Sequence, residues 1–177
     1  MNVNSRKRPN GRVDKGLRFA ILEAMSKFFL LLASFASLAT FACATPRHNI
    51  FVEYSLRDEA ASAIDAWNSA LALECPEVGF SWVSDRDSAD VVVHWGDAPG
   101  ELAGAETDGD IVIEASKMRD ETHTIAVIAH ELGHALDLPD GWHSSNPDDL
   151  MFAPVSKYRG PEPTAADVRA VCEAWGF

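Results

Sequence analysis

A pair of histidines four residues apart, His130 and His134, constrains this sequence more than any other feature. Residues at this spacing lie one turn apart on the same face of an α-helix, so both imidazoles can reach one cation. Zinc binds neutral imidazole, and a catalytic zinc site takes three protein ligands and leaves one position to water. Glu131 is offset from the two ligands, where its carboxylate can take a proton from that water. The pattern therefore predicts a helix that carries two metal ligands and a general base.

Two residues compete for the place of the third ligand. Asp140 lies six residues after His134, and His143 lies nine residues after it. The segment 138–141, Leu-Pro-Asp-Gly, has the form of a β-turn, with proline in the second place and glycine in the fourth. This turn gives Asp140 a structural role without a metal. We therefore prefer His143 and keep Asp140 as the alternative; Glu173, near the end of the chain, is a third candidate.

The stretches HELGHAL and HSSNPDDLM resemble the matrixin-like metzincin peptidases, whose motif HExxHxxGxxH is followed by a Met-turn. The upstream stretches ADVVVHWGD and LAGAETDGDIVIEAS resemble the sheet of that family, and we expect its substrate-binding edge strand around residues 109–115. The closing PTAADVRAVCEAWGF resembles the last helix. The resemblance implies a zinc-dependent endopeptidase that acts on a peptide or protein substrate. It also implies Zn²⁺ as the cofactor, Glu131 as the general base, and Met151 as a hydrophobic floor beneath the metal.

The chain departs from this motif at two places. Asp137 stands where the motif has its glycine, and Asp140 stands where the motif has its third histidine. A turn of three residues added before His143 explains both departures, because it shifts the third ligand and removes the need for a glycine at 137. The departures also motivate an alternative function, an exported zinc-containing binding module without catalytic activity.

The first 44 residues predict export. Residues 1–27 carry seven of the 15 Lys and Arg, and the uncharged segment 28–44 ends in Ala-Cys-Ala, which is typical of a signal peptide and its cleavage site. Met25 offers an alternative start that would give a more compact signal. We expect cleavage after Ala44 and a secreted or periplasmic product without a stable membrane span. An uncleaved signal anchor is the alternative, because an uncharged run of 17 residues is close to the length of a span.

The segment 45–177 is expected to form a single metallopeptidase domain. It holds 8 basic and 25 acidic residues, a net charge of −17, which makes nucleic acid an improbable partner. We expect a monomer. Its two cysteines, Cys75 and Cys172, predict one disulfide in an exported chain, whereas two free thiols are the alternative. The acidic pair Asp148 and Asp149 could bind calcium, but we expect both side chains to be solvated.

Residue patterning predicts an α+β fold with a twisted mixed sheet, a zinc-bearing helix packed on it, and a small C-terminal part that ends in a helix. Alternation and β-branched runs indicate strands, and apolar residues at helical spacing indicate helices. The expected strands are 49–55, 78–84, 89–95 and 109–116. The expected helices are 56–71, one that begins at Thr122 or Thr124, and 164–175 with Thr164 as its N-cap.

Overall fold

The computed structural model describes residues 47–100, 102–139, 143–152 and 160–177. The strands in these residues are β1 (Arg47–Val52), β2 (Gly79–Trp82), β3 (Val91–Trp95), β4 (Gly104–Thr107) and β5 (Asp110–Ile113). The α-helices are α2 (Arg57–Leu71), α3 (Glu121–Ala135) and α4 (Ala165–Ala174), and 3-10 turns lie at Tyr54–Leu56, Arg86–Ser88 and Ala115–Lys117. Every predicted helix and strand is present, and β4 is an additional strand.

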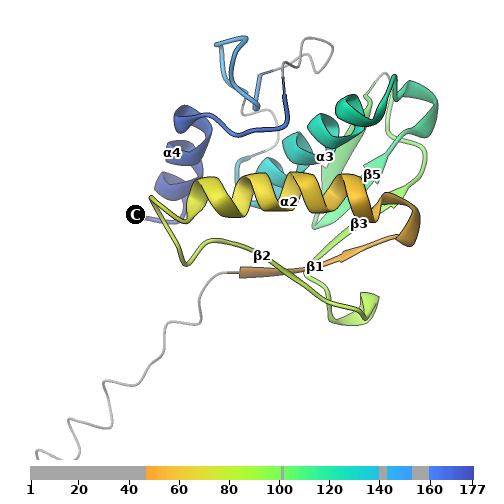
Figure 1. Cartoon of the computed structure of the whole chain (residues 1–177), viewed down its shortest axis with the longest axis horizontal. Helices are drawn as coiled ribbons and strands as arrows, with labels where there is room; N and C mark the ends of the chain where they lie inside the picture. Colours follow the sequence, from red (N-terminus) through yellow and green to blue (C-terminus); the bar gives the residue numbers. More distant parts are fainter. Residues whose placement is uncertain (1–46, 101, 140–142, 153–159) are drawn as a thin grey trace, which may run out of the picture. The chain divides into compact units, whose positions relative to one another are not determined.

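The strands form one mixed sheet in the order β2-β1-β3-β5-β4 (Figure 1). β1 pairs in parallel with β2 and β3, β3 pairs in parallel with β5, and β4 runs antiparallel to β5. The prediction that segment 109–115 forms the edge is wrong, because β5 is paired on both sides. The edge strand next to β5 is β4, a short segment whose glycine and alanine are more typical of a turn than of a strand.

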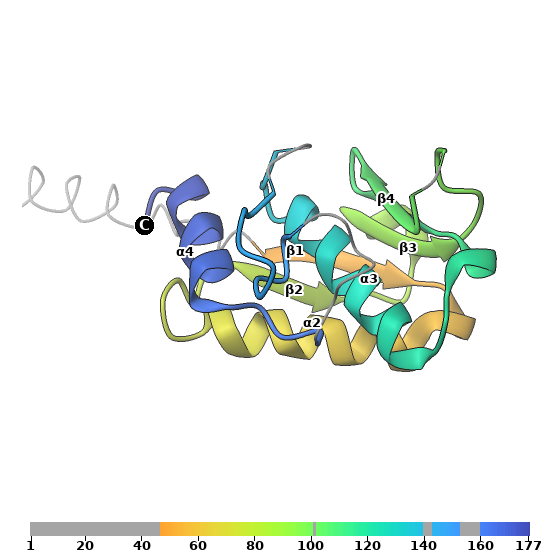
Figure 2. The ribbon, with the colours of Figure 1, turned by 90° about the horizontal axis from the view of Figure 1, so that it is seen from above.

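Helices α2 and α3 run side by side against the sheet (Figure 2). Their apolar residues and alternate strand residues share one core, to which the sheet contributes Ile50, Val52, Val91, Val93, Ile111 and Ile113. The Trp67 indole of α2 donates a hydrogen bond of 2.7 Å to the Ala129 carbonyl, which ties α2 to the middle of α3. The predicted zinc-bearing helix is therefore held between the sheet and a second helix.

Helix α4 is anchored at both ends. Thr164 is its N-cap, as predicted, and forms a capping box with Asp167. A disulfide joins Cys172, near the end of α4, to Cys75, which follows α2. The predicted pairing is thus present, and it connects two segments 97 residues apart.

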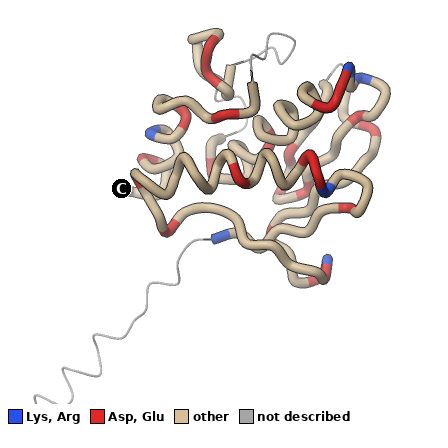
Figure 3. The backbone as a smooth tube through the Cα atoms, in the orientation of Figure 1, with Lys and Arg blue, Asp and Glu red and all other residues tan. Residues whose placement is uncertain are grey.

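Acidic residues outnumber basic residues along the described chain (Figure 3). They are spread over most of its elements and do not gather on one of them. Among the described residues, no helix is long and apolar enough to cross a membrane.

Candidate metal centre

Helix α3 begins one residue before the predicted start. Asp120 is its N-cap, since the carboxylate accepts a hydrogen bond of 2.8 Å from the backbone N–H of His123. From Ala126 to Gly133 every residue is buried, so this stretch has no solvated face. The polar residues in it, His130 and Glu131, are therefore held in an apolar setting.

Asp137 turns the chain away from α3 in the left-handed conformation, with a φ of 67°. The motif's glycine conformation is thus retained with an aspartate, a residue that tolerates this region better than most. Position 137 still requires a residue in the left-handed region, and an aspartate fills it without a glycine. The chain therefore leaves α3 through a left-handed backbone conformation, which a glycine at this position would also adopt.

The structure brings His130, His134 and His143 together. Each offers one ring nitrogen, and these three atoms lie within 4.8 Å of one another. The ring centroids are 5.1 Å apart for His130 and His134 and 5.4 Å apart for each pair that includes His143. This near-equilateral arrangement could hold one metal ion on three imidazoles.

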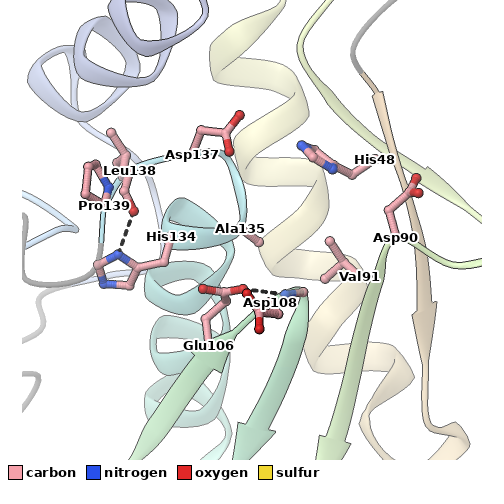
Figure 4. A pocket seen from close by; sticks show the side chains of 11 residues that line it. His48, Asp90, Val91, Glu106, Asp108, His134, Ala135, Asp137, Leu138 and Pro139 are labelled. Atoms are coloured by element: carbon pink, nitrogen blue, oxygen red, sulfur yellow. Dashed lines mark hydrogen bonds between the residues drawn. The ribbon is translucent and has the colours of Figure 1, made fainter.

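Backbone carbonyls orient two of these rings. Nδ1 of His130 lies 3.0 Å from the Leu150 carbonyl, and Nδ1 of His134 lies 3.1 Å from the Leu138 carbonyl (Figure 4). A carbonyl only accepts, so each Nδ1 carries the proton and donates it. The lone pair of each ring is then on Nε2, which is the tautomer that a metal ligand of this kind requires.

Burial keeps His130 neutral. The ring is 3% exposed, and the loss of hydration lowers its pKa to about 4; its hydrogen bond to Leu150 acts in the opposite direction, and the neighbouring His134 and His143 lower the pKa further. At neutral pH the ring is therefore uncharged. This is the form in which imidazole binds zinc, so the donor set fits that ion.

Glu131 lies beside the edge strand. Its side chain is 5% exposed, and a Cβ added to Gly104 of β4 would come within 3.1 Å of its Cγ and Oε1. The same Cβ would lie 2.7 Å from Val127 of α3. Because residue 104 is a glycine, β4 can approach α3 closely at the position of this carboxylate.

Met151 is fully buried against the stretch between the two helical histidines. A Cβ at Gly133 would collide with Met151 Sδ and come within 3.1 Å of Trp67. This close packing accounts for a glycine in the interior of α3, where it costs about 1 kcal/mol relative to alanine. That Met151 forms a hydrophobic floor beneath a metal stays a prediction.

The chain after His143 is held by a buried carboxylate that the sequence did not single out. Asp167 of α4 is 0% exposed and accepts hydrogen bonds from the backbone N–H groups of Leu150, at 3.0 Å, and Met151, at 3.2 Å. Asp149 is 8% exposed, so the prediction that its side chain is solvated is wrong. The sequence assigned no role to Asp167 and predicted a solvated side chain for Asp149.

The other candidates lie elsewhere. Asp140 is outside the described residues. Glu173 is exposed on α4 and does not belong to the histidine group. His94 Nε2 lies 3.1 Å from Asp110 Oδ1 on the sheet, and His94 does not belong to the histidine group.

A cavity of about 390 Å³ borders the group at the C-terminal end of α3 (Figure 4). It reaches from His134 and Asp137 across to the ends of β4 and β3, where Glu106 and Asp90 line it. The cavity includes only one of the three histidines, so it lies beside the candidate centre and does not enclose it. Its acidic lining disfavours an acidic occupant.

Comparison with known proteins supports the fold alone. No protein-family model matches the sequence, and no curated protein does. Among solved structures, the chain is similar to archaemetzincin from Methanopyrus kandleri, with 13% sequence identity and a TM-score of 0.50, over 77% of this chain and 99% of that one. Together with the sheet order and the position of α3, this similarity shows that the chain has a metzincin-type fold.

Proposed function

We propose that this chain is an exported zinc-dependent endopeptidase of the metzincin type, with the matrixin-like arrangement that its sequence resembles. The observation that carries the proposal is the convergence of His130, His134 and His143 beside Glu131. His130 and His134 come from helix α3 and His143 from the segment that follows it, so helical spacing alone does not bring the third histidine to the group.

The three histidines would hold the zinc ion through one nitrogen each. Zinc supplies Lewis acidity, which acidifies a water molecule and polarises the scissile carbonyl. The surroundings favour this chemistry, because the buried Glu131 carboxylate and the buried His130 imidazole interact more strongly with a charged centre than exposed groups do.

Glu131 moves the protons in the proposed reaction. Its carboxylate takes a proton from the attacking water and returns it to the nitrogen of the departing amine, so it acts first as base and then as acid. It follows His130 directly in α3 and is nearly buried, which keeps it close to the metal ligands without exposing it to bulk water.

An extended peptide would bind along the free edge of β4. An edge strand offers unpaired N–H and C=O groups that can pair with a further strand. The Gly104 end of β4 passes Glu131, so a peptide paired there would present a backbone carbonyl near the base. This moves the expected substrate-binding strand from residues 109–115 to Gly104–Thr107.

The proposal of export rests on residues 1–44 and on the disulfide. Disulfides persist in oxidising compartments, and Cys75 and Cys172 form one here. A signal peptide that ends at Ala44 would deliver the domain to such a compartment.

Glu131→Gln tests the proposal. The variant keeps the size of the side chain and removes the base, so we expect unchanged zinc content and peptide hydrolysis reduced by roughly 10²–10⁴-fold. Glu121→Gln, at the exposed start of the same helix, is the matched control. A wild-type protein that binds zinc but cleaves no member of a broad peptide library would instead support the binding module.

A further inference from the structure

His143 depends on its surroundings more than the other two histidines do. His130 is buried and His134 half-buried in α3, whereas His143 is exposed and lies outside any helix or strand. The residue after it, Ser144, is the first one of the following loop. How that loop is held therefore decides where the His143 ring can lie.

Asp149 closes this loop. Its Oδ2 accepts a hydrogen bond from the Ser144 hydroxyl, and its Oδ1 accepts one from the Asn146 amide at 3.0 Å. The Ser144 hydroxyl in turn accepts from the backbone N–H of Asn146 at 3.1 Å. One carboxylate thus binds the first and the third residue of the segment 144–149.

The same carboxylate ties the loop to the last helix. The Thr164 hydroxyl, at the N-cap of α4, lies 3.0 Å from Asp149 Oδ1 and 2.8 Å from Asp167 Oδ2. Since Asp167 holds the two residues that follow Asp149, the carboxylates secure consecutive parts of one turn. Asp149 is only 8% exposed, and burying a carboxylate costs free energy unless its oxygens are hydrogen-bonded. Packing alone therefore does not explain an aspartate at this position.

Ser144 is held on its backbone as well as on its side chain. Its N–H donates to the Met151 carbonyl at 2.8 Å, and it forms an isolated bridge with Phe152. Because both the backbone N–H and the hydroxyl of Ser144 are hydrogen-bonded, this residue has little rotational freedom. The peptide bond between Ser144 and His143 is restrained in the same way. The restraint on Ser144 is therefore passed to the neighbouring ring.

We propose that Asp149 is a positioning residue for His143 as a zinc ligand, acting through Ser144; this inference rests on the zinc site of the proposed function. Asp149 itself touches no metal in this arrangement. Outer partners that orient a ligand typically contribute roughly 10- to 100-fold to metal affinity. The same role explains why a buried acid stands in a loop whose other acid, Asp148, is exposed.

The test measures zinc affinity of the full mature chain by competition with a chromophoric chelator. We expect Asp149→Ala to weaken zinc binding by roughly 10- to 100-fold. The electronic spectrum of the cobalt-loaded variant should shift towards that of cobalt-loaded His143→Ala, which reports loss of this particular ligand.

Two control variants accompany the test. Asp148→Ala, which removes one negative charge next to Asp149, should leave both the zinc affinity and the cobalt spectrum unchanged. Val171→Ala, which loosens the buried face of α4, should lower the melting temperature and leave zinc affinity unchanged.

Ser144→Ala provides a second route if Asp149→Ala does not fold. It removes the hydroxyl that donates to Asp149, so it should also weaken zinc binding. In the double variant Ser144→Ala/Asp149→Ala the loss of affinity should be smaller than the sum of the two single losses. Wild-type affinity in folded Asp149→Ala or Ser144→Ala, or equal weakening in Asp148→Ala, would overturn the inference. Failure of the proposed peptidase activity is seen separately, because zinc affinity and the cobalt spectrum are measured without a substrate.

Discussion

The candidate centre joins two regions that are built in different ways. Helix α3 presents His130, Glu131 and His134 from a regular element that is buried between the sheet and α2. Segment 143–152 presents His143 and Met151 from a chain without helix or strand, which is held by side-chain hydrogen bonds. The first region is positioned by backbone periodicity and apolar packing, and the second by a few buried carboxylates.

This difference indicates that the candidate centre depends on two kinds of interaction, apolar packing in α3 and side-chain hydrogen bonds in segment 143–152. Apolar packing in α3 is spread over many residues, so a single substitution removes only a part of it. The loop depends on few contacts, and the loss of one donor leaves a buried acceptor unsatisfied. Substitutions in the two regions should therefore act differently on metal binding and on stability.

The largest expected effect is the loss of a ligand. His134→Ala and His143→Ala should each weaken zinc binding by more than the roughly 10- to 100-fold that an outer partner contributes. Asp140→Ala should keep the wild-type affinity, because we assign the third place to His143. Zinc titration of the three variants distinguishes the two candidates. If Asp140→Ala loses zinc and His143→Ala keeps it, the third ligand lies outside segment 143–152 and the comparison fails.

Removal of the disulfide should act on the loop region through α4. Cys75→Ser/Cys172→Ser should lower the free energy of unfolding by about 4 kcal/mol, since the bond closes a long loop. Urea unfolding of the double variant and the wild type measures this. Amide exchange should rise first in α4 and in residues 144–152, and a uniform rise across α3 as well would show that the two regions are not separable.

Acid should weaken the metal-free protein through the helical region. The folded-state pKa of His130, about 4, lies below its ordinary value of 6.5, so between these pH values the unfolded chain binds a proton that the folded chain does not. Stability is therefore full above pH 6.5 and falls as the pH drops towards 4, by about 3 kcal/mol in total. Urea unfolding of the metal-free wild type and of His130→Gln across this range should show the smaller pH dependence in the variant.

The smallest expected effect lies at the contact between the two regions. Gly133→Ala should gain helix propensity but force Met151 and Trp67 to move, with a net loss of about 1–2 kcal/mol. In the background of Met151→Ala the same change should cost less, because the sulfur has been removed. Equal costs in both backgrounds, measured by thermal unfolding, would show that Gly133 is not kept for this packing.

Periodicity predicted most of the fold. Ala60, Ile64, Trp67 and Leu71, which identify α2 by their spacing, are all fully buried. β4 could not be predicted, because Gly104–Thr107 contains neither a β-branched run nor a clear alternation. Its place is decided by the antiparallel pairing with β5, which is a long-range property of the sheet.

The site was predictable to the extent that helical geometry governs it. His130, Glu131 and His134 follow from spacing on α3, and His143 follows from the resemblance and from ligand chemistry. The contacts of Asp149 and Asp167 were not predictable, because burial of an acid depends on what packs over it. Nor did composition show that Asp137 would take the left-handed conformation.

The capping box of α4 has a consequence for the order in which the centre can be completed. Asp167 holds the backbone of Leu150, whose carbonyl contacts His130, and Thr164 contacts Asp149 in the loop that follows His143. Both residues come after the three histidines in the chain. A chain that has emerged from the ribosome only as far as Met151 carries all three histidines but lacks these partners. Synthesis thus places the three candidate metal ligands before the groups that hold them, and α4 must form before this arrangement is complete.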